Sequence, residues 1–103
     1  MKKITYNDIS NDTDNLLIVI GKMIPIYKKM QHHTQVLECE QWVIMLSRLP
    51  IQTEYTSEAI LALKNILNDC ANIYLAYGDF ETGTIAMNLM NKIIKLFKEN
   101  EED

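Results

Sequence analysis

The chain contains 103 residues, of which 48% are hydrophobic and 23% are charged. This length and composition predict a single domain over residues 1–103, with enough apolar side chains for a core of its own. Only three Gly and two Pro are present, which excludes a collagen-like or low-complexity chain. Ten basic and fourteen acidic residues give a net charge of -4, and Arg48 is the one arginine. A surface that binds nucleic acid is therefore not expected.

No membrane-spanning segment or export signal is expected. The longest unbroken apolar run, Leu16 to Ile20, is far shorter than the roughly 20 residues that a spanning helix needs. Polar residues follow Met1-Lys2-Lys3 where an export signal would be apolar. We therefore expect a cytoplasmic protein in which Cys39 and Cys70 are reduced core residues rather than a disulfide.

The N-terminal half is expected to hold a loose arm and two helices. Residues 1–12 are polar and predict a loose lead-in. Apolar residues at positions 16, 20, 23, 27 and 30 then predict a helix over about 13–31, capped by Asn11 to Asp14 and kinked at Pro25. The alternative for residues 16–27 is a β-hairpin turning at Gly21-Lys22, because branched residues precede that turn. A second helix, capped by Thr34, has an apolar face at positions 36, 39, 43 and 46 and ends before Pro50.

The C-terminal half predicts two further helices and a tight turn. The first, about 54–77, carries one apolar stripe formed by Ile60, Leu63, Leu67, Cys70, Tyr74 and Tyr77. Gly78 favours a left-handed helix stop and Asp79 favours a cap for the next helix, about 80–99. That helix turns Ala86, Leu89, Met90, Ile93 and Phe97 inward, and residues 100–103 form a frayed acidic tail. The prediction is an all-α fold, either a four-helix antiparallel bundle or two stacked helical hairpins.

Residues 67–94 resemble one tetratricopeptide repeat. Ala71, Tyr74, the turn Gly78-Asp79-Phe80 and Gly83 follow the spacing of small and aromatic residues in that family. The resemblance implies that Gly83 lets two helices approach closely and that Tyr74 wedges between them. Met90 and Lys95 depart from the family pattern, and the first half shows no second copy. The resemblance thus implies a helical hairpin and no peptide-binding groove.

No catalytic, cofactor-binding or metal site is predicted. His32 and His33 with Cys39, Glu38 and Glu40 are the one cluster of metal-ligand residue types, but their spacing matches no helical metal pair or zinc finger. We expect both histidines in a solvated interhelical loop. Isolated glycines exclude a phosphate-binding loop, and neither cysteine has a histidine and an orienting group in a spacing typical of nucleophilic catalysis. The protein is therefore expected not to be an enzyme and to need no cofactor.

The surplus of apolar residues on the first helix predicts a protein interface. Leu17, Ile18, Ile24 and Ile26 lie outside its inward stripe and are the predicted contact residues for another protein or a second copy. The function expected is a non-enzymatic interaction module, such as a small regulator, inhibitor or immunity-type protein. The alternative is a self-associating structural homo-oligomer. Abundant Ile, Asn and Lys with almost no Arg indicate an A/T-rich genome, bacterial or phage.

Overall fold

The computed structural model describes residues 4–48 and 54–101, with side chains up to Lys98 at the C-terminal end. Its helices are α1 (Tyr6–Ile9), the 3-10 turn η1 (Ser10–Asp12), α2 (Thr13–Lys29), α3 (His33–Ser47), α4 (Ser57–Ala76) and α5 (Phe80–Glu101). Among these residues the only β-type pairing is one isolated bridge between Thr5 and Glu54. The predicted all-α fold is confirmed.

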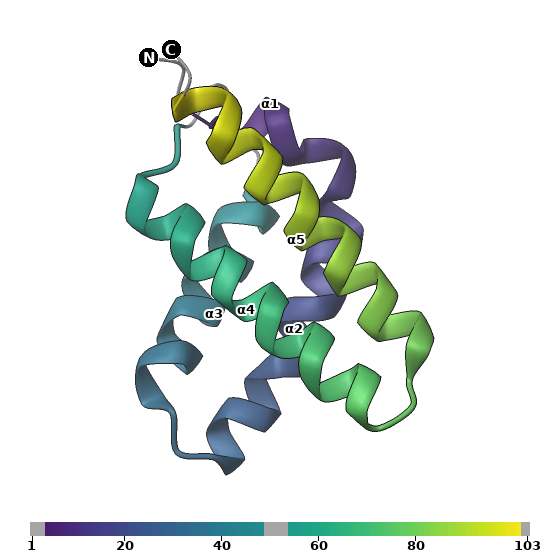
Figure 1. Cartoon of the computed structure of the whole chain (residues 1–103). Coiled ribbons are helices and arrows are strands. Elements are labelled where there is room, and N and C mark those ends of the chain that lie inside the picture. Colours follow the sequence, from purple (N-terminus) through teal and green to yellow (C-terminus); the bar gives the residue numbers. More distant parts are fainter. Residues whose placement is uncertain (1–3, 49–53, 102–103) are drawn as a thin grey trace.

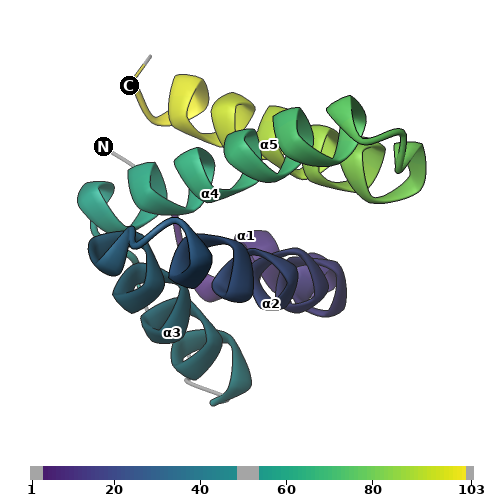
Figure 2. The same ribbon diagram turned by 90° about the horizontal axis from the view of Figure 1, so that it is seen from below.

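The four long helices form two stacked helical hairpins, the second of the two arrangements that the sequence allowed. Helices α2 and α3 pack as one antiparallel pair, and α4 and α5 pack as another (Figure 1). Figure 2 shows the α4–α5 pair as one layer lying over the layer that contains α2 and α3. The apolar core lies between these layers, where Leu16, Trp42 and Leu63 are all buried.

Helix α2 runs through Pro25 without interruption, which excludes the hairpin at Gly21-Lys22. A proline inside a helix removes the hydrogen bond to the carbonyl four residues earlier, and its ring crowds that residue. Here that residue is Gly21, which is exposed like Pro25. Its carbonyl can therefore be solvated, and the proline is tolerated.

The N-terminal segment is folded from Ile4 onward, so the expectation of a loose arm over residues 1–12 is wrong for residues 4–12. Ile4 and Ile9 are buried in the core. The Tyr55 N–H donates to the Ile4 carbonyl at 3.0 Å, and Asp12 forms an ion pair with Lys92 of α5. Ile4 and Ile9 stand alone in a polar stretch, which is too short for hydrophobic periodicity to indicate that they are buried. Residues 1–3 lie outside the described part of the chain.

Helix bounds differ from the prediction mainly at the ends. Helix α3 begins at His33, with His32 rather than Thr34 at the capping position. Helix α5 continues to Glu101, beyond the predicted end at residue 99, and the rest of the predicted acidic tail lies outside the described residues. Thr56 caps α4, where its hydroxyl accepts a hydrogen bond from the Ala59 N–H at 3.0 Å.

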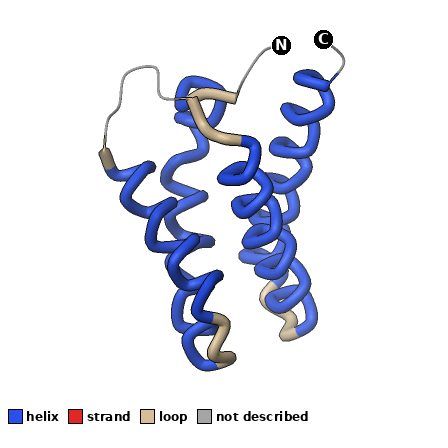
Figure 3. Tube along the Cα trace, turned by 90° about the vertical axis from the view of Figure 1, so that its left-hand side faces the viewer, coloured by secondary structure: helices blue, strands red, loops and turns tan. Residues whose placement is uncertain are grey.

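Both hairpins turn through the same backbone motif. In the first turn Gln31 adopts a left-handed conformation (φ 60°), and the His32 N–H donates to the Tyr27 carbonyl. In the second turn Gly78 does the same (φ 85°), and the Asp79 N–H donates to the Tyr74 carbonyl. This is the Schellman arrangement that closes helix C-termini. Both turns lie at the same end of the molecule (Figure 3).

The two hairpins also share their register of burial. Counted outward from the two left-handed residues, equivalent buried positions are Leu16 and Leu63, Ile20 and Leu67, Met23 and Cys70, Cys39 and Ala86, Trp42 and Leu89, and Leu46 and Ile93. The first hairpin therefore repeats the turn and the burial register of the second, although its residues differ. Met30 and Tyr77, the last members of the apolar spacing predicted for their helices, occupy equivalent positions directly before the turns and are exposed.

Polar contacts of α2 and α3 join the two layers. The Tyr27 hydroxyl of α2 donates to the Asp69 carboxylate of α4 at 2.6 Å, and burial together with this acid raises the pKa of Tyr27. Lys22 of α2 donates to the Thr82 hydroxyl of α5 and lies over the Tyr74 ring. The Trp42 indole N–H of α3 donates to the Ala59 carbonyl of α4 at 3.0 Å. These bonds fix how one hairpin sits on the other.

Exchanging the turn residues tests the turn geometry. A non-glycine residue in the left-handed region is strained by about 1–2 kcal/mol. A glycine avoids this strain, but its greater freedom in the unfolded chain offsets part of the gain. Gln31→Gly should therefore raise the free energy of unfolding by about 0.5–1 kcal/mol, and Gly78→Ala should lower it by about 1 kcal/mol. Urea unfolding followed by circular dichroism measures both. A loss of stability in Gln31→Gly would contradict the turn described above.

Helices α4 and α5 are in close contact at Gly83. A Cβ atom placed on Gly83 would lie 2.6 Å from Leu75 Cγ and 3.2 Å from the Leu75 backbone nitrogen. This close approach is what the resemblance to a tetratricopeptide hairpin implied for Gly83. Tyr74, the expected wedge, is partly buried and packs against the core.

Gly83→Ala and Gly21→Ala form a matched pair of helix substitutions. Nothing lies within 4 Å of a Cβ on Gly21, so Gly21→Ala should gain the alanine helix preference of about 0.5–1 kcal/mol. Gly83→Ala gains the same helix propensity, but its added methyl group overpacks the contact between α4 and α5. The Gly83→Ala variant should therefore be less stable than the Gly21→Ala variant by about 1–3 kcal/mol. Thermal and urea unfolding of both variants provide the comparison. Equal stabilities would contradict a close contact at Gly83.

Candidate functional site

The predicted interface on α2 does not form a continuous exposed face. Ile18 is 51% exposed, but Leu17, Ile24 and Ile26 are partly buried and pack against the core. The reason is the position of α2, which contacts α3, α4 and α5. A helix with three neighbours buries a wide arc rather than one stripe, so most of its surplus apolar residues are used inside the chain.

The side chains of His32, His33 and Cys39 do not lie together in one site. His32 and His33 are both exposed at the first turn, and the His32 ring stacks near that of Tyr27 with centroids 6.1 Å apart. Cys39 is buried in the core. Within the described ranges, the structure holds no group of three or more His, Cys, Asp or Glu residues arranged to bind a metal ion.

Both cysteines are buried free thiols with a raised pKa. Burial, followed by the nearby Glu38 and Glu40 carboxylates, raises the pKa of Cys39 to about 12. Burial raises the pKa of Cys70 to about 11, although Lys22 opposes this shift. A nucleophilic cysteine needs the thiolate form, which these surroundings disfavour. The thiols are suited to packing.

Thiol labelling tests this assignment. A rise in the Cys70 pKa from 9.0 to about 11 lowers its thiolate fraction near neutral pH on the order of 100-fold. Native protein should therefore react with an aromatic disulfide reagent at least that much more slowly than a free cysteine peptide, and both thiols should react in concentrated urea. Rapid labelling of a cysteine in the native protein would indicate an accessible, reactive thiol.

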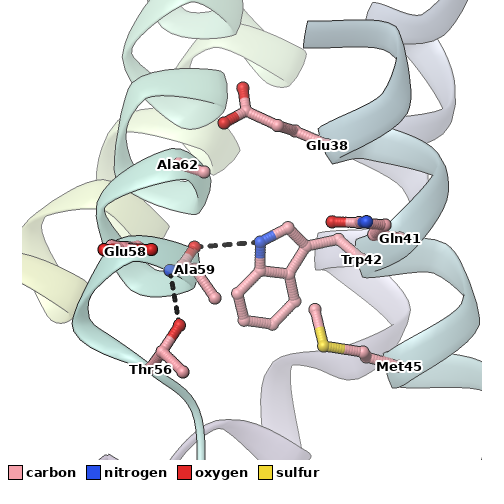
Figure 4. A pocket seen from close by; sticks show the side chains of 8 residues that line it. All are labelled: Glu38, Gln41, Trp42, Met45, Thr56, Glu58, Ala59 and Ala62. Carbon is pink, nitrogen blue, oxygen red and sulfur yellow. Dashed lines mark hydrogen bonds between the residues drawn. The ribbon is translucent and has the colours of Figure 1, made fainter. Parts of the chain in front are cut away.

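A pocket of about 240 Å³ lies between α3 and the N-terminal turns of α4. Its apolar wall is formed by Trp42 and Met45 of α3 with Ala59 and Ala62 of α4. Figure 4 shows the Trp42 ring between the two helices and the Glu38 carboxylate extending from α3 toward α4. The remaining lining residues are Gln41, Thr56 and Glu58.

The pocket is electrostatically negative. Glu38 from α3 and Glu58 from the first turn of α4 both line it, and no described Lys, Arg or His lines it or pairs with either carboxylate. The α4 N-terminus contributes about half a positive charge, which two carboxylates outweigh. The pocket therefore combines apolar walls with an uncompensated negative rim.

The exposed residues on the outer side of the α4–α5 hairpin are uncharged over most of its length. On α4, every exposed residue from Leu61 to Ala76 is uncharged, and the two charged residues of this span, Lys64 and Asp69, are partly buried. We define the neutral face as the exposed residues at helical spacing on the outer side of both helices: Leu61, Asn65, Asn68, Asn72, Ala76, Phe80, Thr84, Met87 and Asn91. Its large apolar members are substantially exposed, Phe80 at 67% and Leu61 at 49%. On α3, by contrast, the exposed Leu37 and Ile44 flank the charged Glu40.

The sequence interpretation missed both surfaces. The pocket depends on the pairing of α3 with α4, which periodicity does not reveal. The neutral face corresponds to exposed, uncharged residues at helical spacing in the sequence, whereas the surplus of apolar residues indicated α2 instead.

The chain matches no protein-family model, no curated protein and no solved structure in comparisons with known proteins. The resemblance of residues 67–94 to a tetratricopeptide hairpin therefore rests on local residues alone and stays a prediction. Within the part of the chain that the structure describes, no helix has the length and apolar character needed to cross a membrane.

Proposed function

We propose that the protein is a non-enzymatic interaction module that binds another protein through the neutral face of the α4–α5 hairpin. The observation that supports this proposal is the lack of charge on that face. Soluble domains usually carry charged residues at about 25–35% of surface positions. The cores of protein interfaces are instead depleted of charge and enriched in aromatic residues and methionine. The neutral face, with Phe80 and Met87, has this second composition.

Energetics favour a covered neutral face. Full burial of an apolar side chain as large as Leu61 or Phe80 is worth roughly 1.5–3 kcal/mol relative to full exposure. Leu61 and Phe80 are still 49% and 67% exposed, so covering them gains about half to two thirds of that amount. A partner that covers them gains this free energy without displacing an intramolecular contact. Such a module acts by occupying a surface of its partner, as a small regulator, inhibitor or immunity-type protein does.

Self-association is the second candidate function, and the same observation favours it. A two-fold dimer places a surface against its own copy, which brings like charges together if the surface is charged. In a chain with a net charge of -4, an uncharged surface avoids that repulsion. Light scattering at high micromolar concentration separates the candidates, because a strict monomer excludes self-association.

Paired charge insertions test the proposed interface. The protein serves as bait for partners from the native lysate, and Leu61→Lys with Met87→Lys should weaken binding of the captured protein about tenfold or more, as expected for central interface residues. Ile18→Lys is the matched control, because Ile18 and Leu61 are equally exposed on different layers. Circular dichroism should show that all variants remain folded.

The outcome distinguishes the two interfaces under consideration. Loss of binding in the Leu61 and Met87 variant with retention in Ile18→Lys supports the neutral face. The reverse pattern would assign the interface to α2, as the sequence predicted, and would contradict the neutral face. Retention in both variants contradicts both surfaces.

A further inference from the structure

We propose that the pocket between α3 and α4 binds the side chain of a lysine or arginine from a partner protein. The cationic end would lie between Glu38 and Glu58, and the aliphatic stem would lie against Met45 and Ala59, beside the buried Trp42. This binding site goes beyond the proposed function, since it uses another side of α4 and none of the residues of the neutral face.

The size of the pocket fits one side chain. Its volume of about 240 Å³ lies below the roughly 300–1,000 Å³ typical of pockets for drug-sized ligands. The Trp42 ring is held in place by the bond from its N–H to the Ala59 carbonyl, at 3.0 Å. Its tilted contact with Tyr55, with centroids 4.9 Å apart, supports it from behind. An apolar wall fixed in this way needs little reorganisation when it is covered.

The chemistry of the pocket matches a long basic side chain. Lys and Arg bury their methylene stems along apolar surface and keep the charged end at a polar rim. Met45 and Ala59, which are partly exposed, supply the accessible apolar surface beside the buried Trp42, while Glu38 and Glu58 supply the rim. Both carboxylates are at least partly exposed, so binding them costs less desolvation than a buried ion pair would.

A divalent metal ion fits less well. Calcium takes six to eight oxygen ligands, and only two carboxylates and the Gln41 amide line the pocket besides the Thr56 hydroxyl. That hydroxyl already accepts a bond from the Ala59 N–H. An ion would also leave the apolar wall of Trp42 and Met45 without a role. An organic cation uses both halves of the pocket.

Blocked amino acids are suitable probes. Trp42 is the single tryptophan of the chain, so its fluorescence reports on this pocket. Titration with N-acetyl-arginine methylamide and N-acetyl-lysine methylamide should give saturable changes with a Kd on the order of 1 mM, the affinity expected for ligands this small. The amide resonances of Gln41 and Ala62 should shift in the same titration. The uncharged norleucine and the acidic glutamate analogues should bind at least tenfold more weakly.

Charge removal at the rim provides the second arm. Glu38→Gln and Glu58→Gln should each weaken binding of the arginine probe several-fold, and the double variant should abolish it. Glu40→Gln is the matched control, because Glu40 is an exposed glutamate of α3 that does not line the pocket. Thermal unfolding of each variant checks that the fold is retained. Raising the salt concentration should weaken binding, as expected for exposed charges.

Each remaining outcome contradicts the proposal. Equal binding of the norleucine analogue would show an apolar pocket without charge recognition. Unchanged binding in the double variant, or no response to either basic probe at tens of millimolar, would leave the pocket without this ligand. Displacement of the probe by calcium chloride, with no effect of potassium chloride at equal ionic strength, would assign the rim to a metal ion. None of these results depends on Leu61 or Met87, so they leave the proposed function untouched.

Discussion

The packing of α2 against α3 of its own hairpin and against α4 and α5 of the other is the interaction on which the rest of the structure depends. Helix α2 contacts α3, α4 and α5, and its buried residues lie at the centre of the core. Without it, Cys70 of α4, which lies near Tyr27 and Lys22, would lose part of its cover. Tyr27 and Lys22 add bonds of fixed direction to this apolar contact, one to Asp69 of α4 and one to Thr82 of α5. Apolar burial supplies the stability, and these two bonds set the angle between the layers.

The sequence predicted the helices well because their local signals agree. In α4 and α5, apolar spacing, the left-handed Gly78 and the Asp79 cap all indicate the same hairpin, and the Thr82 N–H does donate to the Asp79 carboxylate. The first turn gave weaker signals, since Gln31 occupies the position that Gly78 holds in the second turn. The same geometry was therefore recognised in one hairpin and missed in the other. Ile4 and Ile9 were missed for a related reason, since their burial depends on residues distant in sequence.

The candidate site was predicted less well, because exposure depends on how many neighbours a helix has. The sequence interpretation assumed one buried stripe per helix, which holds for α5 but not for the central α2. Leu17, Ile24 and Ile26 were assigned to an interface for that reason. For α4 the opposite holds, since one side of it faces solvent and its exposed residues from Leu61 to Ala76 are all uncharged. Sequence can indicate which residues are apolar, but the packing of layers decides which of them stay exposed.

Helix α4 is shared by both surfaces, which meet at its N-terminal turns. Glu58 lines the pocket, and Leu61 begins the neutral face one turn later. The two surfaces differ in what they contribute. Apolar area provides affinity without direction, whereas a pair of carboxylates favours one orientation and raises the rate of encounter with a basic partner. The Thr56 cap, the Trp42 bond to Ala59 and the contact of Leu75 with Gly83 hold α4 along its length. A partner that covers both surfaces therefore meets a rigid helix, and little of the binding free energy is lost to ordering this chain.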